Sequence, residues 1–334
     1  MKKYWIPLLI AGLAVIATLF FWFFNYGWMG QIEDQIGREQ VYSRHYLLIS
    51  DDDSQLYRSI YESAKETANA QDAWLEWTYA GQQGKNSVSD LMQIGIASKV
   101  DGILLASDEK ITDLIDEAAE KMIPTVTLLE DDSDSLRISF VGINGYQLGE
   151  IYAEQTLDLL QDGKNQIMVL VSSKTENINQ NMILSRIKEI VGRKKLDSQE
   201  IMIQPYGINS TDSFDVEESI RDIFVNSVEL PDILICLDAV ATECAYQAIV
   251  DYNEVGKVKI IGYYASDTVL DAISKKLIPV TIDLNTEDIG KFGVGALTEY
   301  LDQGYVSNYF SVGLDIITEQ TMETILPDSG PDQI

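Results

Sequence analysis

Basic residues are scarce in this chain of 334 residues, which has 24 lysines and arginines against 53 aspartates and glutamates. The formal net charge is therefore −29. A nucleic-acid partner would need a basic surface on the protein, so we exclude nucleic acid. The acidic surplus predicts a solvated acidic surface and does not by itself identify a ligand.

Cysteine and histidine are scarcer still. The two cysteines, Cys236 and Cys244, fall in an apolar strand pattern and in a helical pattern. We expect two buried thiols rather than a disulfide framework. The single histidine, His45, precedes an apolar strand, and metal sites and catalytic triads usually need more. Neither G-x-S-x-G nor H-E-x-x-H occurs, so the sequence offers no catalytic motif.

Two acidic runs, at 51–53 and 130–134, invite a calcium interpretation. Neither run has the regular spacing, central glycine and distant glutamate of a calcium-binding loop. We therefore interpret both runs as solvated loop residues. We predict no metal site and no cofactor.

An uncharged and largely apolar run covers residues 4–31, directly after Lys2 and Lys3. As a helix, residues 5–29 alone would be about 37 Å long, against about 30 Å for the hydrocarbon core of a bilayer. The preceding positive charges predict a cytoplasmic N-terminus and an extracytoplasmic remainder. The alternative is a cleaved signal peptide. Because no small-residue cleavage site follows the run, we expect a single-pass signal anchor over residues 1–30 and a linker over 31–44.

Beyond residue 45, short apolar runs alternate with amphipathic helical patterns. The strand patterns are continuously apolar, as in parallel sheets covered on both faces. Strands are predicted at 46–50, 74–79, 102–106, 125–129, 137–141, 166–171, 200–204, 232–236, 258–262 and 280–283. Helices are predicted at 56–69, 88–98, 111–121, 148–160, 178–194, 216–227, 239–252, 268–275 and 289–301. The second half repeats the rhythm of the first, which predicts an α/β fold of two doubly wound parallel-sheet lobes with a ligand cleft between them.

The stretch 140–160 combines a strand end, a polar turn and an amphipathic helix. The turn contains Gly142 and Gly145, which allow a ligand to approach the backbone closely. Open α/β sheets bind small molecules where a strand's carboxyl end leads into a helix. Asn144 is therefore a candidate to hydrogen-bond a ligand hydroxyl, and the alternative is a turn residue that bonds its own backbone.

Seven local patterns, in the correct order, resemble the type I periplasmic binding proteins of the ribose- and galactose-binding kind. VDGILLASDE at 100–109 is similar to the family's Asp-Gly-Ile-Ile strand. FVGINGYQLGE at 140–150 resembles its Val-Gly-x-Asp-Asn-x-x-x-Gly pattern, and ICLDAVATECAYQAI at 235–249 resembles its Asn-Asp-x-x-Ala helix start. The resemblance covers about residues 45–326 and leaves 327–334 as a tail.

The resemblance implies two lobes joined by a hinge of three crossing strands. The N-lobe would comprise about residues 45–160 and 285–313, and the C-lobe about 164–284 and 314–326. The crossings would then lie near 160–164, 284–285 and 313–315.

The resemblance also implies ligand-binding positions, and there this chain departs from the family. Asn144 and Tyr264 stand where aspartate is usual, and Leu284 stands where glutamine is usual. The implied pocket would have fewer carboxylates and more tyrosine and apolar surface than is typical. The predicted ligand-binding residues are Ser54, Leu56, Tyr57, Ser107, Asn144, Arg186, Phe214, Asp238, Tyr264 and Leu284.

Several of these residues also have a structural alternative. Tyr57 could stack on a ligand or pack a helix face on the sheet. Arg186, which is similar to the family's helix arginine, could contact a ligand or form a salt bridge with Glu189 or Glu176. Asp238 could cap its helix, and Tyr264 could pack at the hinge.

The resemblance implies a membrane-anchored extracytoplasmic solute-binding protein for a sugar or sugar-like ligand. Its partner would be an ABC-type permease in uptake or a sensor histidine kinase in signalling. One alternative is an extracellular α/β hydrolase-like enzyme acting on a carbohydrate, for which the sequence supplies no placed nucleophile. Another is the effector-binding core of a repressor, which the anchor and the acidic charge oppose.

Overall fold

The structure is a computed structural model. It describes residues 42–81, 86–173, 178–209 and 213–325. The predicted anchor, nearly all of the predicted linker and the tail lie outside these residues. Within the described part of the chain, no helix is long and apolar enough to cross a membrane.

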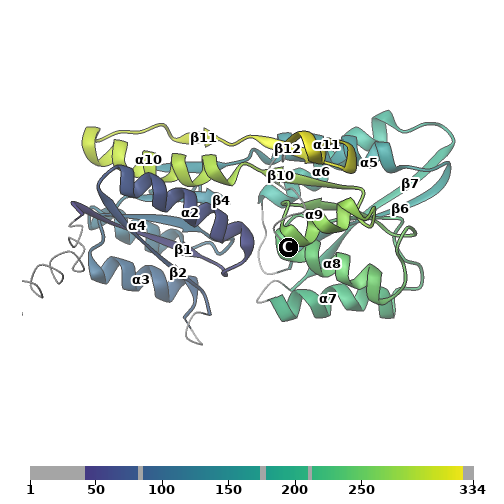
Figure 1. Cartoon of the computed structure of the whole chain (residues 1–334), viewed down its shortest axis with the longest axis horizontal. Helices are drawn as coiled ribbons and strands as arrows, with labels where there is room; N and C mark the ends of the chain where they lie inside the picture. Colours follow the sequence, from purple (N-terminus) through teal and green to yellow (C-terminus); the bar gives the residue numbers. More distant parts are fainter. Residues whose placement is uncertain (1–41, 82–85, 174–177, 210–212, 326–334) are drawn as a thin grey trace, which may run out of the picture. The chain divides into compact units, whose positions relative to one another are not determined.

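The first lobe is built on a six-stranded sheet with the order β11-β5-β4-β3-β1-β2, and its strand pairs are all parallel (Figure 1). Its strands are β1 (Arg44–Ser50), β2 (Ala73–Tyr79), β3 (Gly102–Ala106), β4 (Thr125–Leu129), β5 (Ser139–Gly142) and β11 (Tyr309–Ser311). Its helices are α2 (Gln55–Ala70), α3 (Val88–Ser98), α4 (Thr112–Glu120) and α10 (Thr286–Gln303).

Successive side chains of β1 divide between two layers of helices, as a strand's alternation requires. Tyr46 and Leu48 join the apolar cluster with residues of α2 and α10. Leu47 and Ile49 join the cluster with residues of α3 and α4. The sheet is therefore covered on both faces, which explains why its strands read as continuous apolar runs.

The second lobe repeats this plan, with strand order β12-β10-β9-β8-β6-β7, in which only β12 runs antiparallel to its neighbour. Its strands are β6 (Gly163–Ser172), β7 (Gln199–Ile208), β8 (Ile233–Ile235), β9 (Lys259–Tyr263), β10 (Val280–Leu284) and β12 (Leu314–Ile317). Its helices are α5 (Gly145–Leu159), α6 (Ile178–Lys194), α7 (Ser213–Asn226), α8 (Ala239–Asp251), α9 (Asp267–Ser274) and α11 (Glu319–Ile325).

The two predicted doubly wound lobes are confirmed, and one predicted boundary is wrong. Helix α5 packs against α6, β8 and β9 of the second lobe. The chain therefore crosses between lobes before α5, near Ile143, and not at 160–164. The sequence pattern could not reveal this, because the helix has the same amphipathic signature whichever sheet it covers. The chain passes between the two sheets at two further places: β10 leads into α10, and β11 leads into β12 through Val312 and Gly313.

A glycine lets α10 approach α2 closely. A Cβ at Gly290 would lie 2.5 Å from the backbone nitrogen of Ala64 and 2.6 Å from the carbonyl oxygen of Ile60. Figure 1 shows α10 beside α2 on one side of the first sheet. The close packing of α10 on α2 attaches α10 to the first lobe directly after the chain has crossed over from β10 of the second lobe.

Candidate ligand-binding cleft

A half-buried carboxylate lies at the strand ends of the first lobe. Asp51 follows β1, and its Oδ1 accepts a hydrogen bond from the hydroxyl of Ser107, which follows β3. Its Oδ2 accepts from the backbone N–H of Asp108 at 3.0 Å and from the hydroxyl of Tyr57 at 3.3 Å. Burial, and then the charge of Asp108, raise the pKa of Asp51 to about 7. The predicted residues Tyr57 and Ser107 are thus brought together around Asp51, for which the sequence predicted a solvated loop position and no ligand role.

Aromatic side chains lie beside this carboxylate. The indole N–H of Trp77, in β2, donates to the hydroxyl of Ser50 at 2.9 Å. Tyr61 of α2 stacks on Trp77, with ring centroids 5.0 Å apart. The hydroxyl of Ser50 in turn donates to the backbone carbonyl of Asp52. These rings therefore support the loop that carries Asp51 and Asp52.

The second lobe presents Asp238 at the N-terminus of α8. Its Oδ1 accepts from the backbone N–H of Ala241 at 2.7 Å, so the predicted N-cap is observed. Burial raises the pKa of Asp238 to about 6, and the charges of Asp52 and Asp108 contribute to the increase. Carboxylates of the two lobes are therefore close enough to repel one another.

Tyr263, the last residue of β9, lies near groups of both lobes. Burial raises its pKa, followed by the charges of Glu130 from the first lobe and Asp238 from the second. Burial also raises the pKa of Tyr57, and Tyr263 is among the residues that contribute further. The ends of β1, β4, β8 and β9 thus converge on one polar region, as expected for the ligand cleft of an α/β fold.

A cavity of about 330 Å³ adjoins this region at the ends of β3, β4 and β5. Ser107 and Asn144, two predicted site residues, line it together with Asn179 and Met182 of α6. Its acidic lining residues are Asp108, Glu109, Glu130, Asp131 and Asp132. Among the described lining residues, Lys110 is the one basic side chain. The expectation of fewer carboxylates than is typical of the family stays a prediction.

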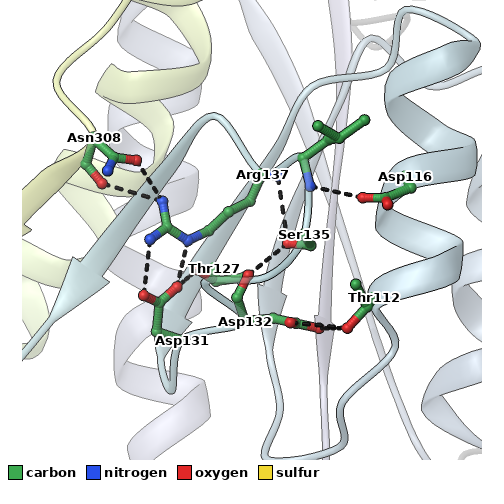
Figure 2. A network of polar contacts seen from close by, with 9 residues as sticks. Thr112, Asp116, Thr127, Asp131, Asp132, Ser135, Arg137 and Asn308 are labelled. Carbon is green, nitrogen blue, oxygen red and sulfur yellow. Dashed lines mark hydrogen bonds and ion pairs between the residues drawn. The ribbon is translucent and has the colours of Figure 1, made fainter.

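The acidic loop after β4 is structural rather than simply solvated (Figure 2). Asp132 is buried and accepts from the hydroxyl of Thr112, at 2.9 and 2.8 Å to its two oxygens. Asp131 binds the guanidinium of Arg137 through both carboxylate oxygens. The same guanidinium donates to the side-chain oxygen of Asn308 at 2.7 Å. This network ties the loop to the chain just before β11, which corrects our interpretation of these acids as solvated.

The run at 51–53 also departs from that interpretation. Asp51 is held by Ser107 and Asp108, as described above, and Oδ1 of Asp52 accepts from the backbone N–H of Ser54 at 2.7 Å. Asp53 is exposed and lies 3.7 Å from Arg58. Within the described part of the chain, no cluster of histidine, cysteine, aspartate or glutamate could hold a metal ion.

Arg186 lies on the surface shared by α5 and α6. Its guanidinium forms ion pairs with Glu150 at 3.0 Å and Glu189 at 2.9 Å, and lies 3.9 Å from the ring centroid of Tyr146. It is not among the described residues that line the cavity. The predicted salt bridge with Glu189 is thus observed, whereas Glu176 lies outside the described residues. Asn179, the second residue of the same helix, lines the cavity instead.

The remaining predicted residues differ in exposure. Leu56, Tyr264 and Leu284 are buried, with 5%, 6% and 3% of their surface exposed. Phe214 is 65% exposed at the start of α7. Ser54 precedes α2 without a side-chain cap bond. The amide oxygen of Asn144 accepts from the backbone N–H of Tyr146 at 2.8 Å, so the predicted turn bond is present while Asn144 also lines the cavity. A ligand role for these residues stays a prediction.

Asp51, Asp108 and Tyr263 were missed because each stands beside a more typical motif residue. The sequence nevertheless placed all three residues at predicted strand ends. Asp51 and Asp108 come directly after or within two residues of a strand end, and Tyr263 ends a strand. Strand ends of a parallel sheet are where functional side chains gather.

The chain also has recognisable relatives. The sequence profile described as the periplasmic binding protein domain matches residues 46–304. A curated protein, ribosome maturation factor RimM of Alkaliphilus metalliredigens (strain QYMF), is 26% identical over 92 residues, which are 28% of this chain and 49% of that protein. The chain thus spans about half the length of that relative.

Several solved structures share the fold. The structure titled XylFII-LytSN complex has a TM-score of 0.70 at 21% identity, over 83% of this chain and 98% of that chain. GanP, a glucose-galactose binding protein from Geobacillus stearothermophilus, has a TM-score of 0.70 at 18% identity, over 83% and 98%. An ABC transporter solute binding protein from Agrobacterium vitis bound with alpha-D-tagatopyranose has a TM-score of 0.71 at 16% identity, over 84% and 95%.

Proposed function

Since the chain belongs to the periplasmic binding protein family, we propose that it is an extracytoplasmic solute-binding protein for a neutral sugar or sugar-like ligand. The observation that carries the proposal is a cavity lined by polar side chains of both lobes. Ser107 and Asp108 come from the first lobe, and Asn144 and Asn179 come from the second. A ligand that contacts both sets favours the arrangement in which the lobes are closed.

The chemistry of the cleft suits a ligand rich in hydroxyl groups. Ionised carboxylates only accept hydrogen bonds, and hydroxyl groups of a sugar donate them. Tyrosine rings such as those of Tyr57 and Tyr263 offer faces on which a sugar ring packs. An anionic ligand would be repelled by the acidic lining of the cavity. The titles of the solved relatives, which name tagatopyranose, glucose and galactose for those proteins, agree with this ligand class.

We extend the proposal to the location and partner of the protein. Residues 1–30 would anchor it as a single-pass helix with a cytoplasmic N-terminus, and the two lobes would lie outside the cell membrane. The partner would be an ABC-type permease or a sensor histidine kinase. The existence of a XylFII-LytSN complex supports a protein partner, because it joins a protein of this fold to a second chain. Membership of the family supports a binding role rather than an enzymatic one.

A thermal-shift screen of the purified full-length protein in a mild detergent tests the ligand class. The panel would hold D-ribose, D-xylose, L-arabinose, D-glucose and D-galactose. A ligand at 100 times its dissociation constant adds about 2.7 kcal/mol to the free energy of unfolding. We expect at least one sugar to raise the melting temperature. A folded protein that responds to none of them would contradict a neutral sugar ligand.

Two substitutions test whether a sugar that raises the melting temperature binds in the cleft. Asp238→Asn and Tyr57→Ala should each reduce the shift, whereas Asp302→Asn, which alters an exposed ion pair with Arg44, should leave it unchanged. A shift of equal size in all three variants would locate the ligand elsewhere. Hydrolysis of a p-nitrophenyl glycoside by the wild-type protein would instead favour the enzyme alternative.

A further inference from the structure

The backbone of Tyr264 has an unusual conformation that β10 holds in place. Tyr264 directly follows β9 and has a φ of 68°, in the left-handed region that non-glycine residues rarely adopt. Its N–H donates to the carbonyl of Ile282 at 2.7 Å, and its carbonyl accepts from the hydroxyl of Thr281 at 3.0 Å. The left-handed backbone turns the chain out of the strand path, so the ring does not follow the alternation of β9.

The side chain of Tyr264 reaches the other lobe. Its hydroxyl lies 2.9 Å from the hydroxyl of Ser59 and donates to the carbonyl of Gln55 at 3.4 Å. The side-chain oxygen of Gln55 also accepts from the backbone N–H of Asp267 at 3.2 Å. Gln55 and Ser59 belong to α2, which packs on β2 and α10 of the first lobe. Three hydrogen bonds thus run from the segment after β9 to the first turns of α2.

These bonds lie next to a hinge segment. Thr281 and Ile282 are residues of β10, whose end at Leu284 leads across to α10 of the first lobe. Hinge motion between two lobes is absorbed by a few residues at the ends of elements. Rotation of the lobes apart would separate Tyr264 from Ser59, because the two residues belong to different lobes. Tyr264 is only 6% exposed, so its hydroxyl would also lose a shielded environment.

We propose that Tyr264 and its partners Ser59 and Gln55 form a latch that holds the two lobes closed without the help of a ligand. The latch consists of the protein's own groups and goes beyond the proposed function, which assigns closure to ligand binding. The latch also changes the apparent affinity for a ligand. Because apparent affinity scales with the fraction of molecules already in the binding-competent state, a latch that fills the closed state raises affinity for any ligand of the cleft.

The distance between the lobes tests the latch directly, with no ligand added. Met122 of the first lobe and Val228 of the second are 88% and 102% exposed. Spin labels on Met122→Cys and Val228→Cys, in full-length protein that also carries Cys244→Ser, report the lobe separation by pulsed electron paramagnetic resonance. We expect a mainly closed distribution for this parent. Tyr264→Phe keeps the ring and removes the hydroxyl, so the ratio of open to closed molecules should rise about fivefold, the usual effect of one net hydrogen bond.

Tyr46→Phe is the matched control. The hydroxyl of Tyr46 lies 3.1 Å from that of Thr298, and both residues belong to the first lobe. Its loss should lower stability but leave the lobe distances unchanged. Ser59→Ala should open the protein in the same direction as Tyr264→Phe, and adding it to Tyr264→Phe should open the protein no further. A Tyr264→Phe distribution equal to that of the parent, a parent that is already mainly open, or an equal shift in Tyr46→Phe would overturn the latch. None of these results depends on the ligand, so each is distinct from a failure of the proposed function.

Discussion

The hydroxyl of Ser107, which follows β3, donates a hydrogen bond to the carboxylate of Asp51, which follows β1. The two residues are 56 positions apart in the chain. They meet because parallel strands β1 and β3 are neighbours in the first sheet and end at the same edge. The carboxylate of Asp51, which Ser107 holds in place, belongs to the polar region on which both lobes converge.

Ser107→Ala should raise the pKa of Asp51 further above its value of about 7. Burial and the charge of Asp108 raise this pKa, whereas the bond from Ser107 lowers it by stabilising the ionised carboxylate. The carboxyl ¹³C chemical shift of Asp51, followed by NMR against pH, measures the change. Ser54→Ala is the control, because it removes a nearby serine hydroxyl that makes no cap bond. An Asp51 pKa that falls or stays constant in Ser107→Ala would refute the assigned role of the bond.

Asp238→Asn should change how stability depends on pH. The folded-state pKa of Asp238, about 6, lies above the ordinary aspartate value of 3.8, so the folded protein holds this proton more tightly than the unfolded chain does. Its stabilising contribution is complete below about pH 4 and is lost as pH rises through about 6. Asparagine keeps the N-cap and removes the charge. The variant should therefore gain stability over wild type between pH 4 and 7, by up to about 3 kcal/mol.

Urea unfolding of wild type and variant at four pH values between 4 and 7 measures this difference. Asp90→Asn supplies a control of opposite sign, because hydrogen bonds from Ser87 lower the pKa of Asp90. Asp90 stabilises the folded state above its unfolded pKa, so its variant should be the less stable protein at pH 7. The deficit should stay nearly constant over this pH range, because it is lost only as pH falls through the folded-state pKa, which lies below the ordinary aspartate value. A pH-independent difference for Asp238→Asn would show that its charge is not destabilising.

Gly290→Ala and Gly295→Ala should have opposite effects although both lie in α10. A Cβ at Gly290 would meet backbone atoms of Ala64 and Ile60, whereas nothing lies within 4 Å of a Cβ at Gly295. Overpacking typically costs about 1–3 kcal/mol, and glycine to alanine in an open helical position stabilises by about 0.5–1 kcal/mol. Denaturant titration of both variants tests the pair. Equal stability changes would mean that α10 and α2 do not pack as closely as described.

Arg137→Lys should destabilise the first lobe. The side chain of Arg137 is 8% exposed, and its guanidinium binds both oxygens of Asp131 while donating to Asn308. An ammonium group cannot reproduce this forked geometry, so we expect a loss of about 2 kcal/mol in the free energy of unfolding. Arg58→Lys, at an exposed pair 3.7 Å from Asp53, should change it by less than about 0.5 kcal/mol. Similar losses in the free energy of unfolding of Arg137→Lys and Arg58→Lys would contradict a stabilising role for the forked contacts of Arg137.

Much of the fold was predictable because strand and helix patterns are local. All ten predicted strands and nine predicted helices correspond to observed elements within a few residues. The short elements β11, β12 and α11 were missed, because β11 and β12 have only three and four residues. The side of the hinge on which α5 lies was also missed, because it depends on contacts with α6 that are distant in sequence from the turn at Asn144.

The site was predictable only in part. The positions of Tyr57, Ser107, Asn144 and Asp238 at strand or helix ends followed from topology. The hydrogen-bond partners of each residue could not be predicted, because they come from other elements of the chain. Arg186 shows the limit clearly: the resemblance left a ligand contact and a salt bridge as alternatives, and the partner Glu150 on α5 could not be read from the helix that carries Arg186 and Glu189.

The measurement that tests the central claim most directly is calorimetric titration of the full-length protein with a neutral sugar and its uronic acid counterpart. The neutral sugar is the one that gives the largest thermal shift. We predict one binding site per chain, at least about tenfold weaker binding of the acid because of the carboxylates that line the cleft, and a smaller difference in Asp108→Asn. Tighter binding of the acid, or affinity for the neutral sugar that neither Tyr57→Ala nor Asp108→Asn alters, would contradict the account.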